Sequence, residues 1–194
     1  MLVPTEKEKM LAGERYDAQD GQLTAERLRT QLLVRELNAT PADQPAERAR
    51  LLGALLPNAG ADLSLNSPFY CDYGANIRVG SQVFFNFNCT ILDVTYVTIG
   101  SRTLLGPGVQ IYTAAHPLDY QERSSGLEFG RPVVIGENVW VGGGAIICPG
   151  VTIGSRSVIG AGSVVTKDIP ADVVAAGNPC RVIRRLRLPA APAQ

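Results

Sequence analysis

The chain has 194 residues, of which 45% are hydrophobic and 19% charged, and its eighteen basic and eighteen acidic residues cancel. This composition is typical of a soluble globular protein, and the balanced charge favours neither a nucleic acid nor an acidic membrane surface as partner. No apolar run reaches the roughly 18 residues that span a bilayer, and the charged segment 6–9 is unlike a signal peptide, so we expect a cytoplasmic protein.

Residues 1–60 have the pattern of helices, each opened by a capping residue. The expected caps and helices are Thr5 with Glu8 as a capping box, Thr24 for a helix over 25–37, and Asp43 for a helix over 46–56. We expect these helices to form a cap that lies on the repeat domain or on a neighbouring subunit, and not a separate core.

A second domain is expected over 61–183, and most of it repeats with a period of six residues. Large apolar residues occupy every sixth position, and a second row of smaller residues follows four positions after each of them. The large row comprises Ile99, Leu105, Ile111, Ile135, Val141, Ile147, Ile153, Ile159 and Val165. Neither a helix nor an alternating strand keeps both rows in register, whereas stacked coils of short parallel strands do. The repeat therefore predicts a mainly β protein built as a parallel β-helix with about eighteen residues per coil.

The same pattern extends back to about residue 67, with Tyr73 expected on the large row and Cys71 on the small row. Eight residues instead of six separate Ile91 from Ile99, so two extra residues must bulge from one corner of a coil. The cysteines show no metal-binding spacing, and we interpret Cys71 as a buried small apolar group.

The rows are interrupted after Ala115, the last expected inward position, and resume at Ile135. The segment 116–132 places proline and polar residues where inward side chains would be needed, so it predicts an external loop. His116, the only histidine of the chain, begins this loop. After the repeat, residues 184–194 form an expected basic tail whose last six residues we predict to be disordered.

Several motifs carry a resemblance to a known family: T-E-K-E-K-M-L-A-G-E-R-Y at the start, C-D-Y-G-A-N-I, Y-T-A-A-H-P-L-D, V-V-T-K-D-I-P and G-N-P-C-R-V-I. Together with the hexapeptide repeat, they make residues 5–186 similar to the maltose and galactoside O-acetyltransferase branch of the hexapeptide-repeat acyltransferases. The resemblance implies a left-handed β-helix and a homotrimer with sites between subunits. It also implies that catalysis needs no metal.

The resemblance further implies transfer of an acetyl group from acetyl-CoA to a sugar hydroxyl, with both substrates bound together and His116 as general base. The implied acceptor-binding residues are Asp17, Asp20, Arg27, Asp72, Asn86, Asp93 and Glu128. The implied acetyl-CoA-binding residues are Trp140, Gly143, Ala161, Gly162, Thr166, Lys167, Arg181 and Arg184. A backbone N–H of residues 142–144 is the candidate oxyanion donor, and Gly143 stands where the family often has serine. Galactoside-type members have a serine at the position of Asp72 and an acidic residue at the position of Val94. Both differences favour the maltose-type branch.

Other interpretations remain open at this level. The same scaffold serves acyltransferases for serine, xenobiotics and lipid precursors, and a β-helix can also be a non-enzymatic assembly protein. Asn86 could be an ordinary corner residue, Arg27 a solvated helix charge, and Trp140 the cover of a corner. A zinc-dependent carbonic anhydrase is excluded, because it would need three histidine ligands and the chain has one.

Overall fold

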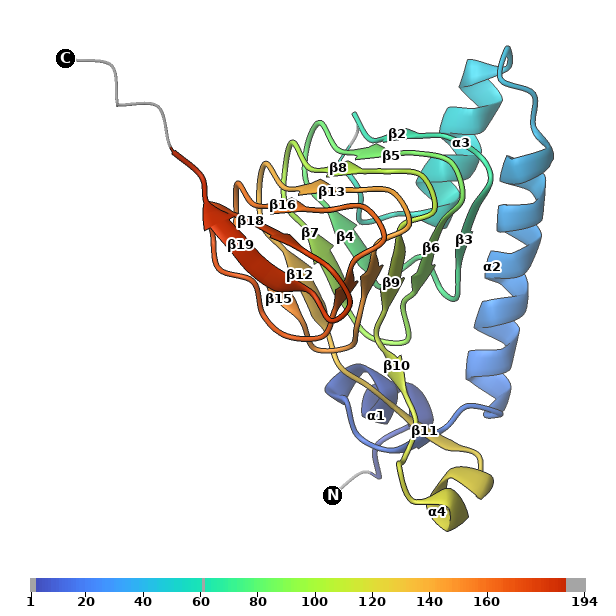
Figure 1. The fold of residues 1–194 in the computed structure, drawn as a ribbon. Coiled ribbons are helices and arrows are strands. Elements are labelled where there is room, and N and C mark those ends of the chain that lie inside the picture. The colour runs from blue at the N-terminus through green and yellow to red at the C-terminus, as the bar shows by residue number, and fades with distance from the viewer. Residues whose placement is uncertain (1–2, 61, 188–194) are drawn as a thin grey trace.

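The computed structural model describes residues 3–60 and 62–187, in which short strands stack into the three faces of a prism (Figure 1). The β2 sheet comprises β2 Ser64–Leu65, β5 Phe84–Phe85, β8 Leu104–Leu105, β13 Trp140–Val141, β16 Val158–Ile159, β18 Val173–Ala176 and β19 Arg181–Arg185. The β3 sheet comprises β3 Phe69–Cys71, β6 Cys89–Leu92, β9 Gln110–Tyr112, β14 Ile146–Ile147 and β17 Val164–Val165. The β4 sheet comprises β4 Ile77–Val79, β7 Val97–Ile99, β12 Val133–Ile135 and β15 Thr152–Ile153.

The predicted large row fills the inside of this prism. Ile99 is in register with Ile135, Leu105 with Val141, and Ile111 with Ile147, all in parallel pairs. The large-row side chains of neighbouring coils therefore stack on one another and are buried. The prediction of a left-handed parallel β-helix is confirmed.

The predicted register is wrong in the first coil. Cys71 pairs with Ile91, which pairs with Ile111, so Cys71 is on the large row and Tyr73 is on neither row. The error arises because Cys71 and Val79, which follow each other on the large row, are eight residues apart. A count in steps of six from Val79 therefore reaches Tyr73 instead of Cys71. Cys71 is buried as expected, but Tyr73 leaves the prism and joins a separate small apolar cluster with Val94.

The extra residues of successive coils all occur at the same place, between the β3 sheet and the β4 sheet. We call this place the loop corner, and it comprises residues 72–76, 93–96 and 113–132. The inward rows end there at Thr113, which is buried, and Ala115 does not point into the prism as predicted. Ala115 has already left the coil, since it pairs with Phe129 outside the prism.

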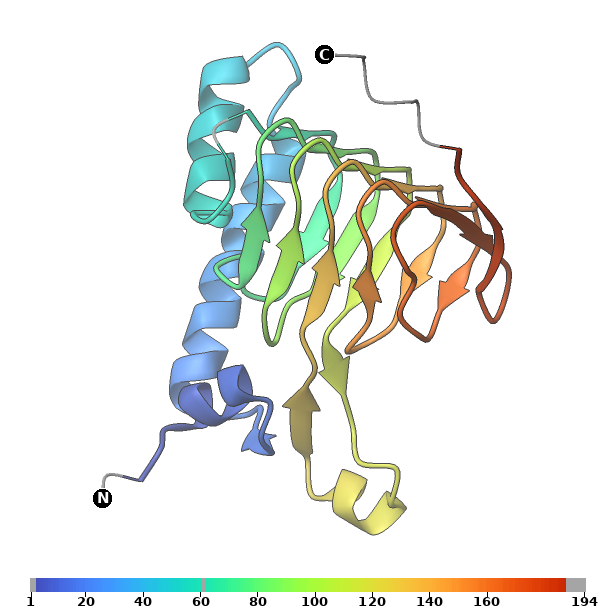
Figure 2. The same ribbon diagram turned by 90° about the vertical axis from the view of Figure 1, so that its left-hand side faces the viewer.

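The predicted external loop is an ordered arm of residues 114–130. It consists of β10 Ala114–Ala115 and β11 Leu127–Gly130, which pair antiparallel, with the short helix α4 Tyr120–Ser124 between them. The N-terminal strand β1 Tyr16–Asp17 adds to the other edge of β11. Figure 2 shows the arm projecting away from the prism.

Three helices precede the prism: α1 Glu6–Ala12, α2 Gly21–Ala39 and α3 Pro45–Leu55. The capping box of Thr5 and Glu8 is confirmed. Asp20, not Thr24, caps α2, because its carboxylate accepts hydrogen bonds from two N–H groups of the first turn. Asp43 does not cap α3, which starts directly at Pro45 without a side-chain cap.

The helices α2 and α3 cover the first coil, where their buried residues Leu37, Leu51 and Leu55 join the core of the prism (Figure 1). The opposite end of the prism carries β19, which is antiparallel to β18 and crosses the expected boundary between residues 183 and 184. The predicted disorder of 189–194 concerns residues outside the described ranges. None of the described helices has the length and apolar character needed to cross a membrane.

Candidate active site

A cavity of about 290 Å³ lies at the loop corner, where four of the predicted site residues meet. His116 follows β10 of the arm, Glu128 lies on β11, Asp72 follows β3, and Arg27 lies on α2. The cavity thus combines an imidazole, two carboxylates and a guanidinium that come from four separate segments of the chain. The first three reach it because the arm and the first bulge leave the prism at the same corner.

The His116 side chain is exposed in the cavity and makes no hydrogen bond with any residue of the described ranges. A ring in this state keeps one nitrogen free to accept a proton from a bound molecule. His116 is therefore available as a base.

Arg27 is held by the protein and does not lie in solvent as an unattached charge. Its guanidinium donates hydrogen bonds to the Tyr73 hydroxyl at 2.8 Å and to the Ala18 carbonyl oxygen. These bonds fix the guanidinium at the wall of the cavity, so Arg27 presents its charge in one orientation.

Glu128 is fixed by a second tyrosine that faces the cavity. The Tyr16 hydroxyl donates to a Glu128 carboxylate oxygen at 2.9 Å. Burial, reinforced by the nearby Glu128 charge, raises the pKa of Tyr16 well above its usual range, so the hydroxyl keeps its proton and remains a donor. One oxygen of Glu128 is thereby used inside the protein, and the other can face a ligand.

Asp93 lies between Leu92 and Val94, which line the cavity, and is itself 0% exposed. One of its oxygens accepts hydrogen bonds from the N–H groups of Asp72, at 2.9 Å, and Tyr73, at 3.0 Å. Its other oxygen is buried without a partner among the described residues. Asp93 therefore holds the bulge that presents Asp72, and it does not reach a ligand itself.

Burial also changes the acidity of both carboxyl groups. It raises the pKa of Asp72 to about 6 and the pKa of Asp93 to about 7. Asp72 is accordingly ionised near neutral pH, while Asp93 is neutral in much of its population below pH 7.

Two further predicted acceptor residues lie outside the cavity lining. Asp17 is exposed, and one of its carboxylate oxygens accepts the N–H of Gln19. Asp20 is occupied as the cap of α2. Asn86 lies across the β3 sheet at the other corner, which we call the glycine corner and which comprises residues 86–88, 106–108, 142–144 and 160–162.

The predicted acetyl-CoA residues fall into two groups. Gly143, Ala161 and Gly162 lie at the glycine corner, and Trp140 lies on the adjacent β13, where it is 56% exposed. A Cβ atom at Gly143 would be 3.0 Å from the Pro107 carbonyl oxygen, so a side chain there would need a small shift of the neighbouring coil.

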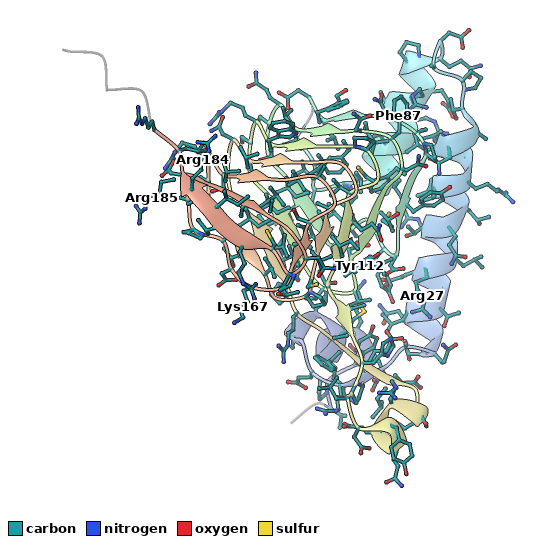
Figure 3. The ribbon with its side chains drawn as sticks, viewed as in Figure 1. Arg27, Phe87, Tyr112, Lys167, Arg184 and Arg185 are labelled. Atoms are coloured by element: carbon teal, nitrogen blue, oxygen red, sulfur yellow. The ribbon has the colours of Figure 1, made fainter. Side chains whose placement is uncertain are left out.

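The second group lies at the far end of the prism from α2. Lys167 and Arg181 line one cavity of about 300 Å³, and Thr166 directly precedes Lys167. Arg184 lies on β19 (Figure 3).

A column of partly exposed side chains links the two ends of the prism. The residues that follow the inward large row on the β3 sheet lie above one another in consecutive coils, and they are Asp72, Leu92, Tyr112, Cys148 and Thr166. Because parallel strands are about 4.8 Å apart, this column is about 19 Å long from Asp72 to Thr166.

The sequence interpretation missed Tyr16, Tyr73 and Leu92, which also line the His116 cavity. The wrong register of the first coil places Tyr73 inside the prism. Tyr16 reaches the cavity through the pairing of β1 with β11, and no local pattern in the sequence predicts that contact.

Metal ligation has no support in this part of the chain. Within residues 3–60 and 62–187, no group of three or more His, Cys, Asp or Glu side chains is arranged to hold a metal ion.

Comparisons with known proteins agree with this architecture. Residues 9–60 match the maltose acetyltransferase hexapeptide capping motif, and residues 132–167 match the bacterial transferase hexapeptide of six repeats. Nodulation protein L of Rhizobium leguminosarum bv. viciae is 54% identical, over 97% of this chain and 99% of the relative.

Two solved structures extend the comparison. A maltose O-acetyltransferase from Clostridium difficile 630 is 51% identical and superimposes with a TM-score of 0.94, over 96% of this chain and 100% of the other. A galactoside acetyltransferase in complex with coenzyme A is 40% identical, with a TM-score of 0.88, over 96% of this chain and 92% of the other. The repeat, the helical cap and these similarities lead to one conclusion: the chain is an acetyltransferase that belongs to the maltose and galactoside branch of the hexapeptide-repeat family.

Proposed function

We propose that this protein transfers the acetyl group of acetyl-CoA to a hydroxyl group of a sugar, with His116 as the general base. The observation that supports this most is the cavity in which His116 meets Asp72, Arg27 and Glu128. A base beside several hydrogen-bonding groups is the arrangement that a hydroxylated acceptor needs, because each hydroxyl both donates and accepts.

The polar groups of the cavity suit a small neutral polyol. Asp72 and Glu128 accept hydrogen bonds from hydroxyl groups, while Arg27 donates to their oxygens. The relative from Clostridium difficile is named a maltose O-acetyltransferase, which supports a sugar as acceptor.

In the proposed reaction, the neutral imidazole of His116 takes the proton of the acceptor hydroxyl as its oxygen attacks the acetyl carbonyl carbon. A new C–O bond forms, the C–S bond of the thioester breaks, and the departing sulfur takes the proton from the imidazolium. The products are the O-acetylated acceptor and free coenzyme A. A base in this role contributes about 10² to 10⁴ in rate, so positioning of the two substrates supplies much of the remainder.

The column from Asp72 to Thr166 offers a path for acetyl-CoA. Lys167, Arg181 and Arg184 supply cations for phosphate groups at the far end, where Figure 3 shows Lys167 and Arg184 well separated from Arg27. The chain between them would lie along the β3 sheet and bring the thioester near Tyr112, four residues before His116. The solved coenzyme A complex of a galactoside acetyltransferase supports this cosubstrate.

A homotrimer with sites between subunits is part of this proposal. Asn86, Trp140 and Gly143 lie at or beside the glycine corner, across the β3 sheet from the loop corner that carries His116. A second copy that brings its glycine corner to this loop corner would unite both groups around one acceptor and one acetyl-CoA. It would also place the N–H of Gly143, which makes no hydrogen bond within the described residues, near the developing oxyanion.

The test is turnover by the His116→Ala variant, followed as thiol release from acetyl-CoA with glucose, maltose, a galactoside and serine as acceptors. We expect sugars to be acetylated by the wild type and turnover to fall by at least 100-fold in the variant, with an unchanged melting temperature. Because His116 is exposed and makes no hydrogen bond in the described structure, its removal should not disturb the fold. Wild-type rates in the variant would refute the base, and exclusive use of serine would refute the sugar acceptor.

A further inference from the structure

A second and larger cavity, of about 710 Å³, lies between α2 and the β3 sheet. We call it the α2 groove. It shares Asp72 and Leu92 with the His116 cavity, so the two spaces meet at the first bulge of the loop corner. The proposed reaction takes place at the smaller cavity, and it gives no role to the wall that α2 forms along the larger one.

One side of α2 forms a wall that runs through both spaces. Arg27 lines the His116 cavity, and Gln31, Arg35 and Asn38 line the α2 groove. These residues are spaced by three or four positions, so they lie on one face of the helix. At a rise of about 1.5 Å per residue, the wall is about 16 Å long, which exceeds the length of a single sugar ring.

The groove offers the kinds of groups that hold a sugar ring. Tyr70 on β3 is 48% exposed, and it provides an aromatic surface with a hydroxyl at its edge. Gln31 and Arg35 are exposed, and their side chains make no hydrogen bond or ion pair within the described part of the chain. Asn38 has a different role. Its amide nitrogen donates to the Phe69 carbonyl oxygen and its amide oxygen accepts the Phe69 N–H, which fixes the strand that carries Tyr70.

The charge of the groove favours a neutral ligand. The lining contains one cation, Arg35, and one carboxyl group, Asp72, while Val34, Cys71 and Leu92 contribute apolar surface. Lys167, Arg184 and Arg185, which suit phosphate groups, lie at the other end of the prism (Figure 3). The volume of the groove is within the range of about 300 to 1,000 Å³ that is usual for small-molecule sites, whereas the His116 cavity is at its lower limit.

We propose that the α2 groove binds a second sugar ring, so that the acceptor is a disaccharide or a longer glycan whose reacting ring lies in the His116 cavity. This inference rests on the proposed function, and it adds that Tyr70, Gln31 and Arg35 select for the extended acceptor. Tyr70 would support the apolar face of the second ring, while Gln31 and Arg35 would bond its hydroxyl groups.

The test compares glucose, with one ring, and maltose, with two, as acceptors for the wild type, Tyr70→Ala and Arg35→Ala. The matched control is Arg29→Ala, which removes the same side chain from another face of the same helix. We expect the ratio of kcat/KM for maltose to that for glucose to fall at least tenfold in Tyr70→Ala and Arg35→Ala and to stay unchanged in Arg29→Ala. An unchanged ratio in both groove variants would overturn the proposal.

Calorimetric titration with maltose and glucose separates this proposal from the reaction itself. Failure of the wild type to acetylate either sugar would refute the proposed function, while tighter binding of maltose that is lost in Tyr70→Ala would still support the second-ring site. Equal binding of maltose and glucose by the wild type would overturn that site whatever the turnover. If the groove variants instead lose subunits by light scattering and weaken both acceptors equally, the groove is an interface between copies, and the proposal is wrong.

Discussion

The buried Asp93 gives the protein a pH-dependent stability that the isosteric variant Asp93→Asn should remove. In the folded chain, burial raises the pKa of Asp93 from the ordinary 3.8 to about 7. The folded state therefore binds more protons than the unfolded state between about pH 4 and pH 7. Its free energy of unfolding consequently falls as the pH rises through this interval, and the loss is complete once the folded-state group has ionised.

The size of the effect follows from the difference between the two pKa values. Each unit of difference between the two pKa values corresponds to about 1.4 kcal/mol, so the full contribution to the free energy of unfolding is about 4 kcal/mol. About half of this contribution is lost between pH 5.5 and pH 8. For a chain of this length, 1 kcal/mol corresponds to about 2 to 4 °C in melting temperature. Other groups titrate in both proteins, so the two melting temperatures must be compared. Between these pH values, the melting temperature of the wild type should fall by about 4 to 8 °C more than that of Asp93→Asn.

Thermal unfolding at pH 5.5 and pH 8, followed by circular dichroism, measures this difference. The asparagine can keep its oxygen toward the N–H groups of Asp72 and Tyr73, so the bulge retains its hydrogen bonds. Asp172→Asn is the control, because the Arg156 side chain lowers the pKa of this partly exposed carboxyl group and its titration lies below the tested range. Equal pH dependence of the wild type and Asp93→Asn would refute the assignment of a raised pKa to Asp93.

Further expected outcomes concern one cap and two substrate sites. Asp20→Ala should lower the free energy of unfolding by about 1 kcal/mol, whereas Thr24→Ala should change it little, and equal losses in chemical denaturation would contradict the capping assignment. Arg184→Ala should raise KM for acetyl-CoA more than KM for the sugar and more than Arg185→Ala does; steady-state kinetics with the opposite pattern would exclude Arg184 from the cosubstrate site. The KM for the sugar should rise below pH 6 as Asp72 gains a proton, because its pKa is about 6, and this rise should be absent in Asp72→Asn.

The interior of the prism was predictable because each coil repeats the same contacts. From Ile99 onward, a constant period leads to one register, and neighbouring coils then bury the same positions. Before Ile99, two bulges of equal length kept the coils aligned with each other while shifting Cys71 and Tyr73 by two positions. A period in the sequence reports the spacing of inward residues, but it does not reveal how many residues a corner adds.

The candidate site was only partly predictable, since its residues come together through contacts between distant segments. His116 and Asp72 stand out because they follow the end of a repeat. The support for Arg27 and Glu128 depends on Tyr73 and Tyr16, which approach them across 46 and 112 positions of the chain. The burial of Asp93 was likewise not predictable, because an aspartate is most often exposed and only the fold shows that it binds the N–H groups of the first bulge.

The three corners of the prism differ in their tolerance of insertions. Where the β4 sheet turns into the β2 sheet, Arg102, Asn138 and Arg156 share a left-handed backbone conformation with φ between 54° and 60°. The backbone is so closely stacked there that a Cβ atom at Gly136 would lie 2.6 Å from the Ser155 nitrogen. An added segment would break this stack, whereas the loop corner already diverts the chain in three coils without disturbing the register. The arm can therefore be lengthened or exchanged while the β3 sheet keeps its dimensions.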